Sequence, residues 1–323
     1  MASGSDSAVY RTQTLSLHQG WNAVFLEVHP TDAEPAKVFA GIPVDIVATF
    51  QARPASAQFV SNPSVDQFRQ EGWGVWYAAD RPDGFLSTLF AVHGHQAYLV
   101  HAKEAFTGRI RGAVVLSEVR WQPGAFNLVG FSVNATAPPT FAEYFRGSKA
   151  HTHNRIYRLV EGSWQRLTDP SNEAMRSGEA FWIYCDGPST YQGPLRVETL
   201  TRRGLVLGAA EAEVILRNET GHPLSPKLEH LPVEGDPVPL SIVVQGVRDP
   251  VSPVKRLVSR KPSGPWLQQM PALEADRSVR IPFHARIEEM QAFCQSSLLR
   301  ISTDLGTESW VPVIGIREDL EEK

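Results

Sequence analysis

Hydrophobic and polar side chains alternate in short runs along the whole chain, and long amphipathic helices are not evident. Alternation with a period of two is typical of a half-buried β-strand. Pro and Gly, 24 of each, are spread between these runs and supply turn residues. The pattern therefore predicts a mainly β protein made of many short strands.

The first 187 residues contain two copies of one pattern. Each copy opens with a Gly that leads into an aromatic residue followed directly by Asn, then has a short helix preceded by prolines, and closes with an apolar strand. The matched segments are GWNAVFL at 20–26 and GAFNLVGF at 124–131, the helices 36–40 and 141–145, and the closing segments 95–100 and 178–183. Three matched features in one order predict a duplication.

The strands expected within the two copies follow from the same alternation. In the first copy they are 10–17, 21–28, 45–50, 73–77, 85–92 and 96–101, and in the second 115–121, 126–133, 155–160 and 163–167. We expect Trp164 to correspond to Trp76. The extra length of the first copy falls mostly in the 53–72 loop, where insertions cost little.

The remainder of the chain has a different pattern of hydrophobic and polar residues. Seven short alternating runs are separated by turn residues, at 205–207, 212–217, 240–244, 256–259, 279–283, 297–303 and 310–314. This spacing predicts an immunoglobulin-like β-sandwich, although the Cys pair of antibody domains is absent. Segment 286–295 fits either a short helix or an irregular crossover.

The fold class is thus mainly β, with two tandem β-rich repeats that carry short helices, followed by the sandwich. The expected divisions are a disordered or artificially added amino terminus (1–9), repeat 1 (10–112), repeat 2 (113–187), a linker (188–195), the sandwich (196–317) and a charged tail (318–323).

Composition narrows the choice of partner and compartment. A net charge of −4 gives no long-range attraction for phosphates, which argues against nucleic acid. No apolar run approaches the roughly 18 residues of a membrane span, and the amino terminus does not have the pattern of a signal peptide. We expect a secreted or cell-surface protein if a leader was removed, and otherwise a cytoplasmic one. Cys185 and Cys294 fall in different domains, and each is expected to be a buried thiol.

The two opening segments, each followed later by a strand Trp and a closing Ala-aromatic-apolar strand, resemble repeat modules of large bacterial surface or secreted proteins. The resemblance covers roughly residues 15–187. In such proteins these units are usually noncatalytic and lie beside immunoglobulin-like domains. The resemblance therefore implies an architecture and assigns no functional residue.

Few side chains have the spacing that catalysis needs. The sequence contains no Gly-rich phosphate loop and no nucleophile elbow, and no catalytic residue or cofactor is expected. Asp80 and Asp83 lie in a turn sequence, which is far commoner than a calcium loop. His93, His95 and His101 are candidate metal ligands because imidazoles two apart on a strand face the same way, but further ligands are missing.

Aromatic residues are the stronger candidates for a ligand or partner surface, where their faces could stack on a sugar or anchor a protein. The candidates are Trp73, Trp76, Tyr77 and Trp164, with core packing as the alternative for most of them. Trp73 and Trp76 must point to opposite faces of a regular strand. Asn22 and Asn127 are expected to bond backbone groups at a turn.

The sequence therefore predicts a noncatalytic binding or scaffolding protein, an adhesion-type module of a bacterial surface or secreted protein that recognises another protein or a glycan. The alternatives are an intracellular interaction subunit of a bacterial multiprotein assembly and, third, an enzyme with a His-bound metal. Oligomeric state stays open. The binding surface is expected where the two copies differ, chiefly in 53–72 and in the loops around Trp73 and His93.

Overall fold

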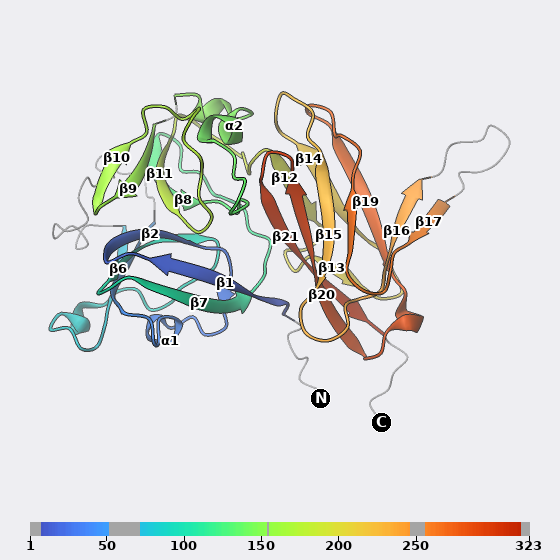
Figure 1. Cartoon of the computed structure of the whole chain (residues 1–323), viewed down its shortest axis with the longest axis horizontal. Helices are drawn as coiled ribbons and strands as arrows, with labels where there is room; N and C mark the ends of the chain where they lie inside the picture. Colours follow the sequence, from blue (N-terminus) through green and yellow to red (C-terminus); the bar gives the residue numbers. More distant parts are fainter. Residues whose placement is uncertain (1–7, 52–71, 154, 246–255, 318–323) are drawn as a thin grey trace.

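The computed structural model describes residues 8–51, 72–153, 155–245 and 256–317, and in these ranges it is almost entirely β. Five sheets form two lobes (Figure 1). We call residues 8–194 the repeat lobe and residues 195–317 the sandwich lobe. No helix in the described ranges has the length and apolar character needed to cross a membrane.

Repeat 1 contributes two antiparallel sheets to the repeat lobe. The outer sheet has the order β1-β7-β3 and the inner sheet the order β2-β6-β4-β5. The strands are β1 (Tyr10–Leu17), β2 (Gly20–Leu26), β3 (His29–Pro30), β4 (Val44–Phe50), β5 (Trp73–Tyr77), β6 (Gln96–Ala102) and β7 (Phe106–Ala113), with helix α1 (Pro35–Val38) and the 3-10 turn η1 (Gly84–Leu86). Apolar residues of β1, β2 and β6 fill the space between the two sheets.

Repeat 2 contributes one antiparallel sheet of order β10-β9-β11-β8. Its elements are β8 (Ala125–Gly130), α2 (Phe141–Phe145), the 3-10 turn η2 (Lys149–His151), β9 (Ile156–Val160), β10 (Ser163–Arg166) and β11 (Ala180–Cys185). Helix α2 begins at a capping box, in which the Glu143 N–H donates to Thr140 and the Glu143 carboxylate accepts from the Thr140 N–H. Buried aromatic residues of α2 cover the outer face of the sheet.

The duplication is visible in both strand order and register. The inner sheet of repeat 1 and the sheet of repeat 2 place corresponding strands in the same sequence, with β2, β6, β4 and β5 matched by β8, β11, β9 and β10. Asn22 pairs with Val100 in the first copy, and Asn127 pairs with the matched Ile183 in the second.

The register corrects one expected correspondence between the copies. Trp73 pairs with Phe50 of β4, and Trp164 pairs with the equivalent residue Leu159 of β9. Trp164 therefore corresponds to Trp73, and the expected match with Trp76 was wrong. Counting along the sequence failed because 52–71 separates β4 from β5, while a tight hairpin joins β9 to β10.

The two matched sheets pack face to face, as expected for tandem repeats that share a core. Their common core contains Trp21, Leu99, Leu159 and Trp182. Trp182 is fully buried there, and the layer it occupies joins the two copies into one lobe.

The sandwich lobe consists of two five-stranded sheets, in agreement with the predicted sandwich. One has the order β12-β14-β19-β16-β17 and the other β13-β21-β20-β15-β18. Their strands are β12 (Leu195–Thr199), β13 (Leu205–Leu207), β14 (Ala212–Asn218), β15 (Pro226–Pro232), β16 (Leu240–Gln245), β17 (Arg256–Arg260), β18 (Trp266–Gln269), β19 (Ser278–Ala285), β20 (Cys294–Thr303) and β21 (Glu308–Ile316), with the 3-10 turn η3 (Ile287–Glu289). A single apolar cluster fills the space between the sheets.

Several expected elements differ from the structure. No strand forms over 115–121 or 85–92, while β7, β12, β15 and β18 were not predicted. Segment 286–295 contains only η3 before β20 begins. The expected 188–195 linker packs against repeat 2, because Tyr191 is buried in the core beside α2 and donates a hydrogen bond to the Tyr144 carbonyl. Of the expected disordered segment 1–9, residues 1–7 lie outside the described residues, while Val9 is buried and accepts a hydrogen bond from Val114 N–H. The expected tail 318–323 also lies outside the described residues.

The lobes are joined by backbone contacts as well as by side chains. The turn between β20 and β21 docks on residues 132–137, where Asn134 N–H donates to the Gly306 carbonyl and Glu308 N–H to the Ser132 carbonyl, at 2.8 and 3.1 Å. Gly306 has φ of +81°, and a Cβ at this position would lie 1.9 Å from the Ala137 oxygen. Only glycine fits this approach without displacing one lobe.

Candidate functional site

Two of the four candidate aromatic residues are core residues. Trp73 and Trp164 are 9% and 8% exposed, and each ring lies 6.2 Å from the ring of Trp182. They fill the layer between the two matched sheets. The expectation that these two present faces to a ligand was therefore wrong, because the sheet face that carries each ring is covered by the sheet of the other repeat.

Trp76 has a different position, whereas Tyr77 lies on the same strand face as Trp73 and packs against the edge of that layer. Trp76 points away from Trp73, as the strand period requires, and stacks on Phe39 with ring centres 6.4 Å apart. Trp76 and Tyr77 are only partly buried, and both line a surface groove of about 500 Å³. The groove also contacts Pro35 of helix α1 and Leu89. Its floor is thus apolar.

Among the described residues of this lobe, the exposed large apolar side chains lie on the connection from β5 to β6. Phe85 is 83% exposed, Phe90 is 77% exposed and Leu86 is 43% exposed. Phe85 and Phe90 both border the groove, so that ring and groove surfaces are continuous. We call Phe85, Leu86, Phe90 and the groove floor the apolar patch.

The apolar patch lies where a strand was expected over 85–92. Its alternating apolar residues do not enter a sheet, because the polar residues among them satisfy the free edge of β5 instead. Ser87 Oγ accepts from Tyr77 N–H at 3.0 Å and Thr88 Oγ1 accepts from Val75 N–H at 3.1 Å. The N–H groups of Thr88 and Leu89 both donate to the Val75 carbonyl, at 2.7 and 2.9 Å. The loop is therefore fastened along β5 by its polar residues, and Phe85, Leu86 and Phe90 remain exposed.

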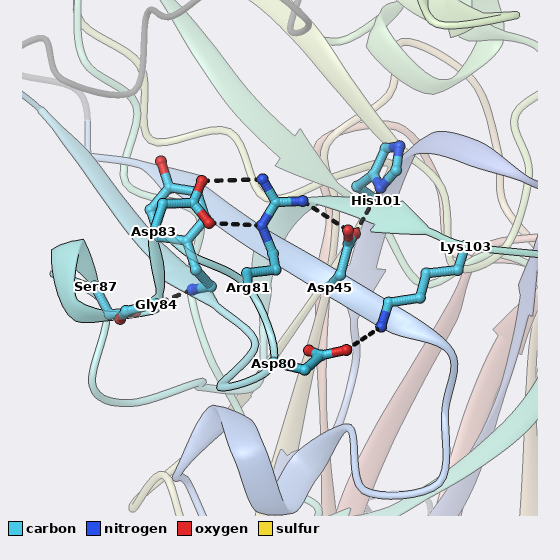
Figure 2. Close-up of polar contacts among 9 residues, drawn as sticks. Asp45, Asp80, Arg81, Asp83, Gly84, Ser87, His101 and Lys103 are labelled. Carbon is cyan, nitrogen blue, oxygen red and sulfur yellow. Dashed lines mark hydrogen bonds and ion pairs between the residues drawn. The ribbon is translucent and has the colours of Figure 1, made fainter.

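A network of charged side chains fastens the other end of the loop (Figure 2). Arg81 donates two hydrogen bonds to Asp83, at 2.8 and 2.9 Å, and a third to Asp45 of β4 at 2.8 Å. These bonds hold the pKa of Asp83 below its ordinary value. Asp45 also bonds His101 Nδ1 at 2.6 Å. The expected turn around Asp80 and Asp83 is present, and its carboxylates bind cationic side chains.

The three candidate metal ligands do not converge. The His93 ring stacks on His29 with centres 5.3 Å apart, whereas His101 bonds Asp45 from β6. His95 packs edge-on against Phe25, and burial lowers its pKa to about 4. In the ranges that the structure describes, no three His, Cys, Asp or Glu side chains are grouped as metal ligands.

Of the other expectations about single residues, three are confirmed and one is wrong. Asn22 and Asn127 do bond backbone groups at the turn before their strands. Cys185 is buried, as expected, and its thiol donates to the Gly187 carbonyl at 3.0 Å. Cys294 is exposed, so its expected burial was wrong. It lies at the first position of β20, where the sandwich core does not reach it.

Sequence reasoning missed Phe85, Leu86 and Phe90 because it assigned them to a strand. The signal that could have found them is the comparison of the two copies, since the matched connection of repeat 2, residues 167–179, contains no aromatic residue. The expectation that a surface lies where the copies differ covers this loop, between Trp73 and His93. The other expected location, 53–72, lies almost wholly outside the described residues.

Comparison with known proteins gives little further help. No family model matches the chain, and no curated protein matches it. Among solved structures, a Salmonella enterica SafA pilin with its SafB chaperone is 11% identical over 39% of this chain and 56% of its own, with a TM-score of 0.24. A PapD-like domain of human CEP192 is 10% identical over 40% of this chain and 87% of its own, with a TM-score of 0.21. The Enterococcus faecalis MSCRAMM ACE, described as binding its ligands by the collagen hug model, is 7% identical over 96% of this chain and 84% of its own, with a TM-score of 0.22.

Proposed function

We propose that this chain is a noncatalytic binding protein and that the apolar patch is its contact surface. The observation that carries the proposal is the exposure of Phe85 and Phe90, at 83% and 77%, on a loop fastened at both ends. Contiguous exposed apolar surface on a folded protein commonly marks an interaction site. Aromatic residues are also the side chains most often responsible for binding energy.

The anchoring of the loop makes the patch suitable for binding. A partner that buries these two nearly fully exposed Phe rings removes roughly 300 Å² of apolar surface from water. This burial contributes about 7 kcal/mol to the free energy of binding, before the cost of association is subtracted. Because the loop backbone is already bonded to β5, little ordering cost is added on binding. The patch can therefore act as the energetic centre of a larger interface.

The groove walls favour a protein over a glycan as the partner. A glycan needs polar groups around an aromatic platform to bind its hydroxyls. Of the polar side chains that line this groove, Arg81 and Ser87 already bond Asp45, Asp83 and the Gly84 carbonyl, and Glu34 pairs with Lys37. Apolar side chains of a protein match such walls better.

The finer part of the proposal is that the chain is an adhesion-type module of a bacterial surface or secreted protein, as its resemblance to repeat modules implies. In the alternative, an intracellular subunit of a multiprotein assembly, the same patch would contact a neighbouring subunit. Co-purification of a stoichiometric partner from the cytosol of the native host, in preference to secreted or surface fractions, would favour the alternative.

The test replaces Phe85 and Phe90 together by Ser. Partner proteins are captured from host surface, secreted and cytosolic fractions, and the affinity of each captured protein is measured by calorimetry. We expect the double variant to weaken binding at least about tenfold while leaving the melting temperature unchanged, since both rings are exposed. Leu200→Ser is the matched control, because Leu200 is 94% exposed in the sandwich lobe.

Equal binding by the wild type and the Phe85→Ser/Phe90→Ser variant would show that the surface lies elsewhere. A hydrolase or transferase activity that a single His or Asp substitution abolishes would refute the noncatalytic assignment.

A further inference from the structure

The apolar patch is bordered by charged residues of helix α1 and of the loop before it. Lys37 Nζ lies 2.8 Å from Asp32 and 3.3 Å from Glu34, and all three side chains are about half exposed or more. Glu34 itself lines the groove, and its segment is attached to the β5–β6 connection, because Val92 N–H donates to the Ala33 carbonyl at 2.7 Å. One ammonium group therefore faces two carboxylates at this side of the groove.

A second group of charged residues, around Arg81 of the groove lining, has the same excess of carboxylates. Arg81 is shared between Asp83 and Asp45, so one guanidinium again faces two carboxylates (Figure 2). Lys103 and Asp80 form a separate pair at 2.7 Å and balance each other. We call these eight residues the acidic rim: Asp32, Glu34, Lys37, Asp45, Asp80, Arg81, Asp83 and Lys103. Its five carboxylates, of which Asp45 is buried, against three cations leave a formal charge of −2, with His101 left out of the count.

We infer that the partner of this surface is a basic amphipathic protein segment, whose apolar face enters the groove and whose Lys or Arg residues meet the acidic rim. This inference rests on the proposed function and adds the chemistry of the partner. Complementary charge around an apolar centre selects a partner and speeds encounter more than it adds affinity. A groove that accepts one apolar face is also a common way of recognising an amphipathic helix.

The same charges disfavour two other occupants. An anionic lipid surface would be repelled by a rim of net negative charge, although exposed Phe rings alone could enter a bilayer. A second copy of the chain, packed about a two-fold axis through the patch, would bring two acidic rims together. Charge complementarity thus selects the basic segment.

The experiment uses the full chain and three synthetic amphipathic peptides as probes. The peptides share one apolar face and carry Lys, Gln or Glu on the polar face, and their binding is measured by fluorescence anisotropy at low and high salt. We expect the Lys peptide to bind about tenfold more tightly than the Glu peptide at low salt, with the difference shrinking at high salt. Phe85→Ser/Phe90→Ser should weaken the Lys peptide at least about tenfold, and Leu200→Ser should not.

A second variant tests the acidic rim itself. Asp32→Asn with Glu34→Gln removes two exposed carboxylates without touching the rings, and should weaken the Lys peptide about threefold while strengthening the Glu peptide. Circular dichroism checks that each variant retains its fold.

The outcomes separate the inference from the proposed function. Equal affinity for all three peptides, lost in Phe85→Ser/Phe90→Ser, overturns the basic partner and leaves the binding patch standing. No saturable binding of the Lys peptide also overturns the basic partner. Binding that does not depend on Phe85 and Phe90 overturns the patch as well. Ring-dependent binding to phosphatidylserine vesicles, or ring-dependent dimerisation in the ultracentrifuge, would replace the basic segment by a membrane or a second copy.

Discussion

The structural role of the two repeated Asn residues can be tested quantitatively. In repeat 1, Asn22 Oδ1 accepts from His18 N–H at 3.0 Å, and Asn22 Nδ2 donates to the carbonyls of His18 and Gly20 at 2.8 and 2.9 Å. In repeat 2, Asn127 bonds Gln122 and Ala125 in the same pattern, at 2.8 to 3.1 Å. Both side chains are nearly buried, at 5% and 3% exposure.

The expected cost of removing either side chain follows from this geometry. Asn22→Ala or Asn127→Ala loses three hydrogen bonds at about 1 kcal/mol each, which predicts a loss of about 3 kcal/mol in the free energy of unfolding. Asp keeps the acceptor oxygen but turns a carboxylate toward two carbonyl oxygens. Asn127→Asp should therefore destabilise at least as much as Asn127→Ala at neutral pH.

Urea unfolding, followed by tryptophan fluorescence and circular dichroism, measures these changes. With a urea dependence of about 3 kcal/mol/M, the midpoint should fall by roughly 1 M in each Ala variant. The two should agree within about 1 kcal/mol, because they remove the same set of bonds. Asn172→Ala is the control, since Asn172 is exposed and bonds only a nearby Asp169 side chain and its own turn. A change below about 0.5 kcal/mol in either turn variant would refute the structural role of the repeated Asn.

Three further predictions follow from buried groups and close contacts. Trp182→Ala empties the centre of the layer between the matched sheets, and should lower the free energy of unfolding by about 3–5 kcal/mol in the same urea assay. His230 is fully buried beside Ser297, and burial lowers its pKa to about 4. Between pH 6.5 and 4, His230 is therefore protonated in the unfolded chain and neutral in the native chain. Stability should therefore fall by about 2 kcal/mol at this residue between pH 7 and 5, and urea titrations of His230→Gln should lack that part of the pH dependence. Gly306→Val should drive the β20–β21 turn away from Ala137 and raise the radius of gyration in small-angle X-ray scattering, whereas Gly264→Val, with open space at its Cβ, should not.

Local pattern predicted the elements whose side chains obey a simple period. Strands β1, β4, β5 and β6 and helix α2 lie where alternation and prolines placed them. The strands β12, β15 and β18 were missed, because alternation is hard to recognise in short segments that contain charged residues or Pro. In these segments the neighbouring strands, more than the local sequence, decide the structure.

The candidate site could be predicted only in part. The chain contains Trp76 and Tyr77 as recognisable strand aromatics, but their exposure depends on whether helix α1 and the loop over 84–90 cover them. Trp73 and Trp164 have the same local pattern and are buried, because repeat 2 packs onto that face of the sheet. Burial of an aromatic side chain is thus decided by which sheet face meets which partner, a tertiary contact between residues distant in sequence.

The sequence by itself determined the duplication, the mainly β character and the sandwich, because alternation, turn residues and a repeated Gly-aromatic-Asn opening act over a few neighbouring residues. Only the tertiary structure decided that Phe85 and Phe90 stay exposed. Their loop satisfies the edge of β5 through Ser87 and Thr88 and is held by Arg81 against Asp45, a residue of another strand. Hydrogen bonds between strands distant in sequence fix which side chains face solvent, and this information is not present in the local alternation of the chain.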